Sequence, residues 1–246
     1  MYCTIYTVMI EYSKSQKEQN MAHYVMSDIH GEMDRFDAML EKIRFTEADE
    51  LYILGDVVDR GPRGVTLLRR IMKEENVHML LGNHEHMLLN YFSPHATETD
   101  YRRWNRNGNG PTLDELVMLH KRSMQELLRY LQGLPIHIEL NVGGKDFYLV
   151  HGFPGNTLHD EVWGRPTVDT PNPLPGKQVI VGHTPVLNLI PEEKREDYAR
   201  ELIRNKDHLR IMHCPGFIDL DCGSGHRINF KALSCLRLED MEEFYT

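Results

Sequence analysis

Short apolar runs, each followed at once by small or polar residues, recur along the chain and predict buried strands. Runs this short and this apolar suit the interior strands of a sheet that is covered on both faces. Each run gives way to a loop that begins with Ser, Gly or His. The five runs are residues 24–26, 51–54, 77–81, 147–150 and 179–181.

Between the first three runs the apolar spacing changes to that of amphipathic helices. One apolar face is formed by Met33, Phe36, Met39, Leu40 and Ile43, and another by Val65, Leu68, Ile71 and Met72. The repeated order of strand, loop, helix and strand predicts a layered α/β architecture.

The strand pattern stops over residues 93–135, and we expect a helical insertion there. Two capping-box signatures, Thr112 with Glu115 and Ser123 with Glu126, are each expected to open a short helix within it. The insertion would interrupt the sheet-forming part of the chain without adding strands to it.

After the insertion, alternating apolar residues over 136–142, a Gly143-Gly144 turn and a return over 146–150 predict a hairpin and a second sheet. Residues 154–177 are rich in Pro and Gly and lack periodicity. A loop of that length in a compact domain is usually functional or disordered, and we interpret this one as functional.

The C-terminal third of the chain and its first 20 residues show simpler patterns. Residues 191–207 are charge-dense with apolar residues at helical spacing, which predicts a solvated surface helix, and residues 216–238 are expected to form paired strands. The polar stretch before Met21 predicts a loose N-terminal extension over residues 1–20. Residues 21–246 are then one domain.

Composition narrows the class of protein. With 41% apolar and 26% charged residues, the chain has the makeup of a globular protein with a sizeable core. A net charge of −9 argues against binding to duplex DNA or to an anionic membrane, and the first ten residues are too few to span a bilayer. The four cysteines form no C-x-x-C pair, which favours reduced thiols and a cytoplasmic protein.

The candidate chemistry lies where the strands end. All five predicted strands are followed by Asp, His or Asn, and ligands gather at the carboxyl ends of strands in open α/β folds. Such oxygen and imidazole donors suit manganese, iron or zinc, and they could hold two ions if one carboxylate bridges. A purely structural zinc site would instead be closed and usually rich in cysteine. The six candidates are Asp28, His30, Asp56, Asn83, His151 and His183.

The residues around these candidates form five ordered motifs, 28–31, 55–61, 82–85, 151–152 and 182–184. Together they resemble the motifs of the calcineurin-like metallophosphoesterases, in particular the small bacterial and phage serine/threonine protein phosphatases. The D-R-G ending of the second motif is similar to that of the protein phosphatases and of the related diadenosine tetraphosphate hydrolases. The resemblance runs from about residue 24 to 238 and implies a layered β-sandwich flanked by helices.

The resemblance also implies a set of metal ligands. It assigns Asp28, His30 and Asp56 to one ion, and the same Asp56 with Asn83, His151 and His183 to the other. Two ions held in this way would activate a bridging hydroxide for direct attack on the phosphorus, with no covalent phosphoenzyme. Manganese is the first expectation, with iron or zinc as alternatives.

Further residues match catalytic positions of the family. His84 is similar to its general acid, with Asp59 holding the imidazole, and Arg60 matches its motif arginine. Arg165, in a W-x-R sequence, is the candidate for a second phosphate-binding arginine.

Two other segments have a less specific resemblance. Residues 104–110 resemble a W-x-x-N-G-G segment, although Asn109 stands where glycine is usual, so Asn107 is either a pocket residue or part of a turn that caps the insertion. Residues 219–223 are similar to an I-D-x-G strand, which we interpret as structural.

The sequence leaves two hydrolase functions open. The first is a protein phosphatase that acts on phosphoserine or phosphothreonine, with phosphotyrosine as an extension. The second is a hydrolase of dinucleoside polyphosphates, such as diadenosine tetraphosphate, or of small phosphorylated metabolites. A non-catalytic binding module is disfavoured because no ligand position has been lost, and a nuclease because the chain is acidic.

Overall fold

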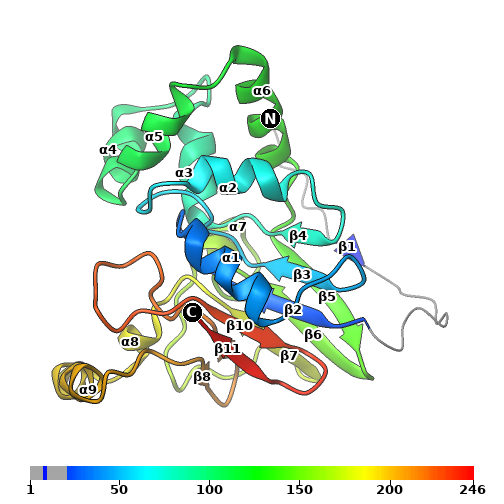
Figure 1. Cartoon of the computed structure of the whole chain (residues 1–246), viewed down its shortest axis with the longest axis vertical. Coiled ribbons are helices and arrows are strands. Elements are labelled where there is room, and N and C mark those ends of the chain that lie inside the picture. Colours follow the sequence, from blue (N-terminus) through cyan, green and yellow to red (C-terminus); the bar gives the residue numbers. More distant parts are fainter. Residues whose placement is uncertain (1–7, 10–20) are drawn as a thin grey trace.

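The computed structural model describes residues 8–9 and 21–246, which form two facing sheets with helices outside them (Figure 1). The first sheet has five strands, in the order β11 (Glu243–Tyr245), β10 (Ser234–Arg237), β2 (His23–Met26), β3 (Glu50–Ile53) and β4 (Val77–Met79). The second has six, in the order β1 (Val8–Met9), β5 (His137–Val142), β6 (Lys145–Val150), β7 (Lys177–Val181), β9 (Ile218–Asp219) and β8 (Met212–His213).

Strand directions place five strand ends on one side of the molecule. Strands β2, β3 and β4 are parallel in the first sheet, and β6 and β7 are parallel in the second. Strands β5 and β6 form the predicted antiparallel hairpin. All five predicted buried strands are therefore present, and the prediction of a layered α/β sandwich is confirmed.

Alternation along each strand explains why the apolar runs are continuous. In β2, Tyr24 and Met26 pack with the helices outside the sheet, whereas Val25 packs in the core between the two sheets. In the second sheet, Phe147 and Leu149 point into that same core. Both faces of these two strand segments are buried, so their positions are apolar on both sides.

The outer helices follow the predicted periodicity. Helix α1 (Met33–Lys42) buries Phe36 and Met39, and helix α2 (Gly64–Ile71) buries Val65 and Leu68 against the first sheet. Helix α3 (Asn83–Tyr91) begins four residues after the end of β4, so its first residues lie near the strand's carboxyl end.

Helices also form in the predicted insertion, and they lie together beside α2 and α3 (Figure 1). They are α4 (Glu98–Arg106), α5 (Gly110–Leu116) and α6 (Lys121–Gln132). Their expected starts were wrong, because Thr112 and Ser123 lie inside α5 and α6 and neither caps a helix. A capping box instead opens α4, between Thr97 and Asp100. Thr112 is instead buried, and its hydroxyl donates a hydrogen bond to Asp59 at 2.6 Å.

The segment 154–177 is not entirely a loop. It contains α7 (Leu158–Trp163), which a second capping box between Thr157 and Asp160 opens. After the short α8 (Val186–Leu189), the charge-dense segment forms the predicted surface helix, α9 (Glu192–Asn205). Leu202 is the buried residue of α9, which accounts for its mostly polar sequence.

The segment 216–238 contains strands, but they do not form one pair. Strand β9 joins the second sheet beside β7, whereas β10 joins the first sheet beside β2. The intervening chain therefore crosses from one sheet to the other, past the ends of β2 and β7. This crossing places a loop at the edge of the candidate site.

The proposed N-terminal extension, residues 1–20, lies outside the described residues except for Val8 and Met9, which pair in parallel with β5. Within the described ranges, no helix combines the length and apolar content needed to cross a bilayer.

Candidate active site

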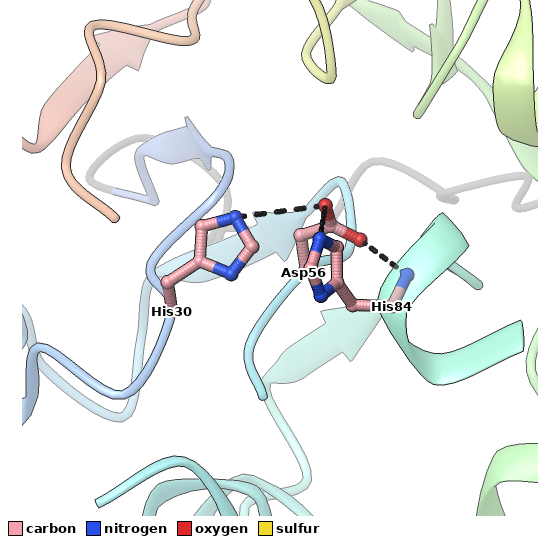
Figure 2. Close-up of side chains that lie close together, drawn as sticks. All are labelled: His30, Asp56 and His84. Carbon is pink, nitrogen blue, oxygen red and sulfur yellow. Dashed lines mark hydrogen bonds and ion pairs between the residues drawn. The ribbon is translucent and has the colours of Figure 1, made fainter. Parts of the chain in front are cut away.

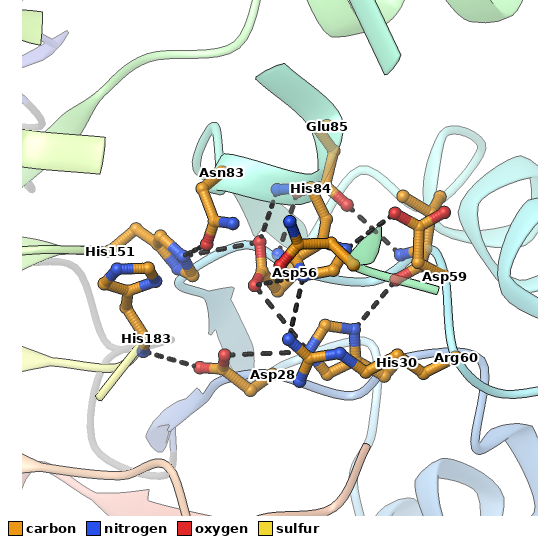
Figure 3. Close-up of polar contacts among 12 residues, drawn as sticks. Asp28, His30, Asp56, Asp59, Arg60, Asn83, His84, Glu85, His151 and His183 are labelled. Atoms are coloured by element: carbon orange, nitrogen blue, oxygen red, sulfur yellow. Dashed lines mark hydrogen bonds and ion pairs between the residues drawn. The ribbon is translucent and has the colours of Figure 1, made fainter. Parts of the chain in front are cut away.

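The six predicted ligands converge at the carboxyl ends of β2, β3, β4, β6 and β7 (Figure 3). Each follows its strand directly or within four residues, and both sheets contribute. The six side-chain positions are almost fully enclosed, with relative exposures between 0% and 4%. The structure therefore brings together, in one buried cluster, residues that come from five distant stretches of sequence.

Asp56 lies at the centre of this cluster, with its two carboxylate oxygens turned to different histidines. Oδ2 of Asp56 is 3.7 Å from Nε2 of His30, and Oδ1 is 3.3 Å from Nε2 of His151. Figure 2 shows His30 and His84 turned toward the same carboxylate. Two groups of donor atoms result, each within 4.8 Å, namely Asp56 with His30 and His84, and Asp56 with His151 and His183.

Asp28 and Asn83 complete the two groups. Oδ1 of Asp28 is 3.9 Å from Nε2 of His30, and Oδ2 accepts a hydrogen bond from the backbone N–H of His183 at 2.9 Å. Oδ1 of Asn83 lies 3.0 Å from Nε2 of His151. Asp28 thus lies between the two groups, and Asn83 lies beside the second.

The histidines are poised to bind cations. Nδ1 of His30 is 2.9 Å from the carbonyl oxygen of Val58, which leaves Nε2 as the atom available to a metal. Nε2 of His30 and of His183 are buried and have no hydrogen-bond partner among the described residues. Burial lowers the pKa of His151 to about 4, and it holds the pKa values of His30 and His183 well below their usual range. Neutral imidazole is the form that binds metals.

The buried carboxylates of the cluster also favour bound cations. Burial, and then the charges of Asp28 and Glu85, raise the pKa of Asp56 well above its ordinary value. Buried like charges repel one another, and divalent cations between them would remove that penalty. With imidazole, carboxylate and amide donors in two groups that share one carboxylate, the residues fit a pair of metal ions.

The ligands occupy strained backbone conformations. Asp28, His30, Asp56 and His183 have positive φ angles of 53°, 49°, 56° and 65°, which residues other than glycine rarely adopt. Such strain persists where surrounding interactions fix the backbone, and it is concentrated at functional sites.

Glu85 supplies part of that restraint, and sequence reasoning gave it no role. Its carboxylate is fully buried and accepts hydrogen bonds from the backbone N–H groups of Asp56, Val57 and Val58 at 2.8, 2.9 and 3.2 Å. The strained loop that carries Asp56 is thus held from α3. The only sequence signal for this role was the position of Glu85 in the third motif.

The general-acid candidate is held by a network that reaches into the insertion. Nδ1 of His84 lies 2.6 Å from Oδ2 of Asp59, and the indole of Trp104 donates to the same oxygen at 2.7 Å. The hydroxyl of Thr112 donates to Oδ1 of Asp59 at 2.6 Å. Sequence reasoning placed Asp59 beside His84 but missed Trp104 and Thr112 as the residues that orient Asp59.

Two arginines border the cluster. The guanidinium of Arg60 approaches Nε2 of His84 at 3.0 Å and Nε2 of His226 at 3.4 Å. Arg165 is exposed, and its guanidinium donates to the carbonyl oxygen of His183 at 3.1 Å. Both predicted arginines therefore lie at the rim, where a phosphate group could reach them.

His226 was not predicted as a site residue, and it arrives on the loop that crosses between the sheets. Gly225 in that loop packs so closely on His30 that an added Cβ would lie 2.2 Å from Cδ2 of the ring. Only glycine fits at this contact. The loop had no sequence signal other than its position after residues 219–223.

The W-x-x-N-G segment forms a turn that supports Arg60. The carbonyl oxygen of Gly108 accepts the backbone N–H of Arg60 at 2.9 Å, while the side-chain amide of Asn107 donates to the carbonyl oxygen of Arg103. Of the two interpretations of this segment, the structure favours the turn. Asp219 and Asp221 are buried and hydrogen-bonded to backbone N–H groups nearby, in keeping with a structural role.

Comparison with known proteins agrees with this geometry. Residues 21–216 match the family model of the calcineurin-like phosphoesterases. A symmetrical bis(5'-nucleosyl)-tetraphosphatase from Acidovorax ebreus is 36% identical over 133 residues, which are 53% of this chain and 43% of the relative. The matched stretch is thus less than half the length of that relative.

Solved structures share the fold. A candidate diadenosine tetraphosphatase has a TM-score of 0.57 at 17% identity, over 93% of this chain and 94% of the other. A protein serine/threonine phosphatase from Saccharomyces cerevisiae has a TM-score of 0.56 at 11% identity, over 91% and 74%. The family match covers most of the chain and spans the six predicted ligands and His84. The chain belongs to the calcineurin-like phosphoesterase family.

Proposed function

We propose that this protein is a metal-dependent hydrolase of dinucleoside polyphosphates that cleaves the phosphate chain by direct attack of water. The observation that carries the proposal is the pair of donor groups that share Asp56, one of which includes His84. This arrangement suits hydrolysis of a phosphate ester or anhydride without a covalent intermediate. Two arginines at the rim add the positive charge that a polyphosphate requires.

The metal ligands would be the six residues of the cluster. When bound there, two divalent cations supply the chemistry that lowers the pKa of a water molecule and offsets charge on the phosphoryl oxygens. We propose that the two ions are manganese, iron or zinc, and manganese is the first metal to test. His84, Asp59 and the two arginines would then supply the proton and bind the phosphate oxygens.

His84 is the residue that provides the proton. In symmetrical cleavage of a tetraphosphate, the oxygen of water bonds to an inner phosphorus and one proton of that water passes to solvent. The bond from the same phosphorus to the oxygen that bridges the second and third phosphates breaks. The departing oxygen takes a proton from Nε2 of His84, while Asp59 holds Nδ1 and stabilises the protonated ring. Two nucleoside diphosphates result. Arg60 and Arg165 would bind the phosphate oxygens on either side of the reacting phosphorus.

The relatives support one choice of substrate over the other. The sequence alone placed hydrolysis of phosphoserine and phosphothreonine first, because its motifs resemble those of protein phosphatases. The curated relatives at 36% identity are symmetrical bis(5'-nucleosyl)-tetraphosphatases, whereas the solved protein phosphatase shares the fold at 11% identity. The dinucleoside polyphosphate is therefore the better-supported substrate.

A direct comparison of substrates tests the proposal. Purified protein reloaded with manganese is assayed on diadenosine tetraphosphate, on phosphoserine, phosphothreonine and phosphotyrosine peptides, and on p-nitrophenyl phosphate. We expect the highest kcat/KM for diadenosine tetraphosphate, with ADP as the sole nucleotide product. A higher kcat/KM for a phosphopeptide would restore the protein-phosphatase hypothesis, and formation of ATP and AMP would show a different point of cleavage.

A further inference from the structure

A pocket of about 670 Å³ opens beside Arg60, between helix α2 of the main domain and helix α5 of the insertion. This volume lies in the range of small-molecule sites, roughly 300–1,000 Å³. The pocket does not include the metal-binding cluster itself. The lining residues that matter here are Arg60, Val65, Arg69, Asp114, Met118 and Leu119.

Arg60 connects this pocket to the catalytic cluster. Its side chain lines the pocket, while its guanidinium lies 3.0 Å from Nε2 of His84. A general acid must face the oxygen that departs, so the side of the cluster at His84 is the leaving-group side. The pocket therefore begins where the departing half of the substrate must lie.

The position of Arg60 is fixed from the insertion. Its backbone N–H donates to the carbonyl oxygen of Gly108 at 2.9 Å. Gly108 has a φ angle of 94°, and a Cβ there would lie 3.2 Å from Cγ of Arg60, so a larger residue would press on the arginine. The insertion thus builds one wall of the pocket and also restrains the arginine at its inner end.

The chemistry of the walls is that of a nucleotide site. Arg60 and Arg69 offer two cations for a diphosphate, and arginine binds phosphate oxygens through paired hydrogen bonds. Met118 and Leu119 present apolar surface suited to a nucleobase. The exposed carboxylate of Asp114 can accept hydrogen bonds from ribose hydroxyls or an exocyclic amine.

Met118 also stands out by its exposure. Its side chain is 81% exposed, a high value for a large apolar residue that lines a pocket. Val117 beside it is 77% exposed but does not line the pocket. Met118 and Val117 therefore form a matched pair for an experiment. They have nearly the same solvent exposure, but only Met118 lines the pocket.

We propose that this pocket binds the departing nucleoside diphosphate, an inference that rests on the proposed hydrolysis of dinucleoside polyphosphates. The inner arginine holds the phosphate next to the cleaved bond, and Arg69 holds the outer phosphate. The nucleobase lies against Met118 and Leu119, which follow α5. A substrate with a small leaving group would engage only the inner end, at Arg60.

The test uses two pocket variants, Arg69→Ala and Met118→Ser, with Arg122→Ala and Val117→Ser as their controls. Arg122 lies on α6, away from the pocket, and its side chain is 89% exposed. For each protein, kcat/KM is measured on diadenosine tetraphosphate and on p-nitrophenyl phosphate. We expect the ratio of the two values to fall about tenfold in Arg69→Ala and several-fold in Met118→Ser. The controls should keep the wild-type ratio.

A second measurement separates this inference from the proposed function. ADP is added to p-nitrophenyl phosphate assays, and its inhibition constant is compared among the same proteins. Weaker inhibition of Arg69→Ala and Met118→Ser, but not of the controls, supports the pocket even if the wild type does not cleave diadenosine tetraphosphate. Equal inhibition of all five proteins, together with unchanged substrate ratios, would overturn the pocket assignment while leaving any observed hydrolysis intact.

Discussion

Trp104 of the insertion donates its indole N–H to the same oxygen of Asp59 that lies 2.6 Å from Nδ1 of His84. The indole is fully buried, so the contact is shielded from water. The insertion therefore does more than form a wall, because it helps to orient the residue that we assign as general acid.

Replacement of Trp104 by Phe should weaken catalysis selectively. The ring is retained, but one hydrogen bond to a carboxylate is lost, and such bonds contribute about 1.5–3 kcal/mol. If the loss affects the transition state, kcat should fall by about tenfold to a hundredfold on substrates with poor leaving groups. An aryl phosphate should lose less, and its rate serves as the internal control for folding and metal content. Equal losses on both substrates would place Trp104 outside the proton-transfer network.

The variant His84→Asn tests the proton donor itself. It should lower kcat by on the order of 10²–10⁴ on diadenosine tetraphosphate or an alkyl phosphate, because the departing oxygen must then leave without a positioned acid. The rate with p-nitrophenyl phosphate should fall much less, since that leaving group needs little protonation. A uniform fall across a series of leaving groups would contradict a general-acid role for His84.

The contribution of Glu85 can be measured as both stability and activity. In Glu85→Gln an amide N–H₂ replaces one of the oxygens that accept the backbone N–H groups of residues 56–58, so at least one buried donor loses its partner. An unsatisfied buried donor costs about 1–3 kcal/mol, which should lower the thermal midpoint. Activity should also fall, because the strained loop that carries Asp56 loses its restraint. Glu193→Gln, on the exposed α9, should change neither the thermal midpoint nor the activity.

The strands and the ligands could be predicted from sequence because each ligand stands next to the strand that positions it. Asp28 follows β2 by two residues, and His151 follows β6 directly. Local patterns carry such information. The same local reasoning failed at Thr112, where a sequence typical of a helix cap instead places a hydroxyl on Asp59. It also failed over residues 154–177, where one capping box opens a helix inside a Pro-rich stretch.

The supporting residues could not be predicted because their contacts are long-range and leave no periodic signal. Glu85 restrains the backbone of Asp56, 29 residues earlier, and Trp104 reaches Asp59, 45 residues earlier. Gly225 packs on His30 from the far end of the chain. Nothing in the spacing of these residues indicates a partner, so only the folded arrangement of the two sheets and the insertion shows that they belong to the site.

The shared carboxylate gives the sharpest prediction for the metal centre. In Asp56→Asn both donor groups lose a charged oxygen, whereas Asp28→Asn removes one from a single group. After metal stripping and reloading with manganese, we expect the wild type to bind two ions per chain. Asp28→Asn should bind one ion tightly and the other weakly. Asp56→Asn should bind both ions weakly. Elemental analysis and manganese titration provide the metal content independently of turnover. Because both ions depend on Asp56, hydrolysis of p-nitrophenyl phosphate should be abolished in Asp56→Asn. Two tightly bound ions and near-wild-type turnover in that variant would show that Asp56 does not bridge.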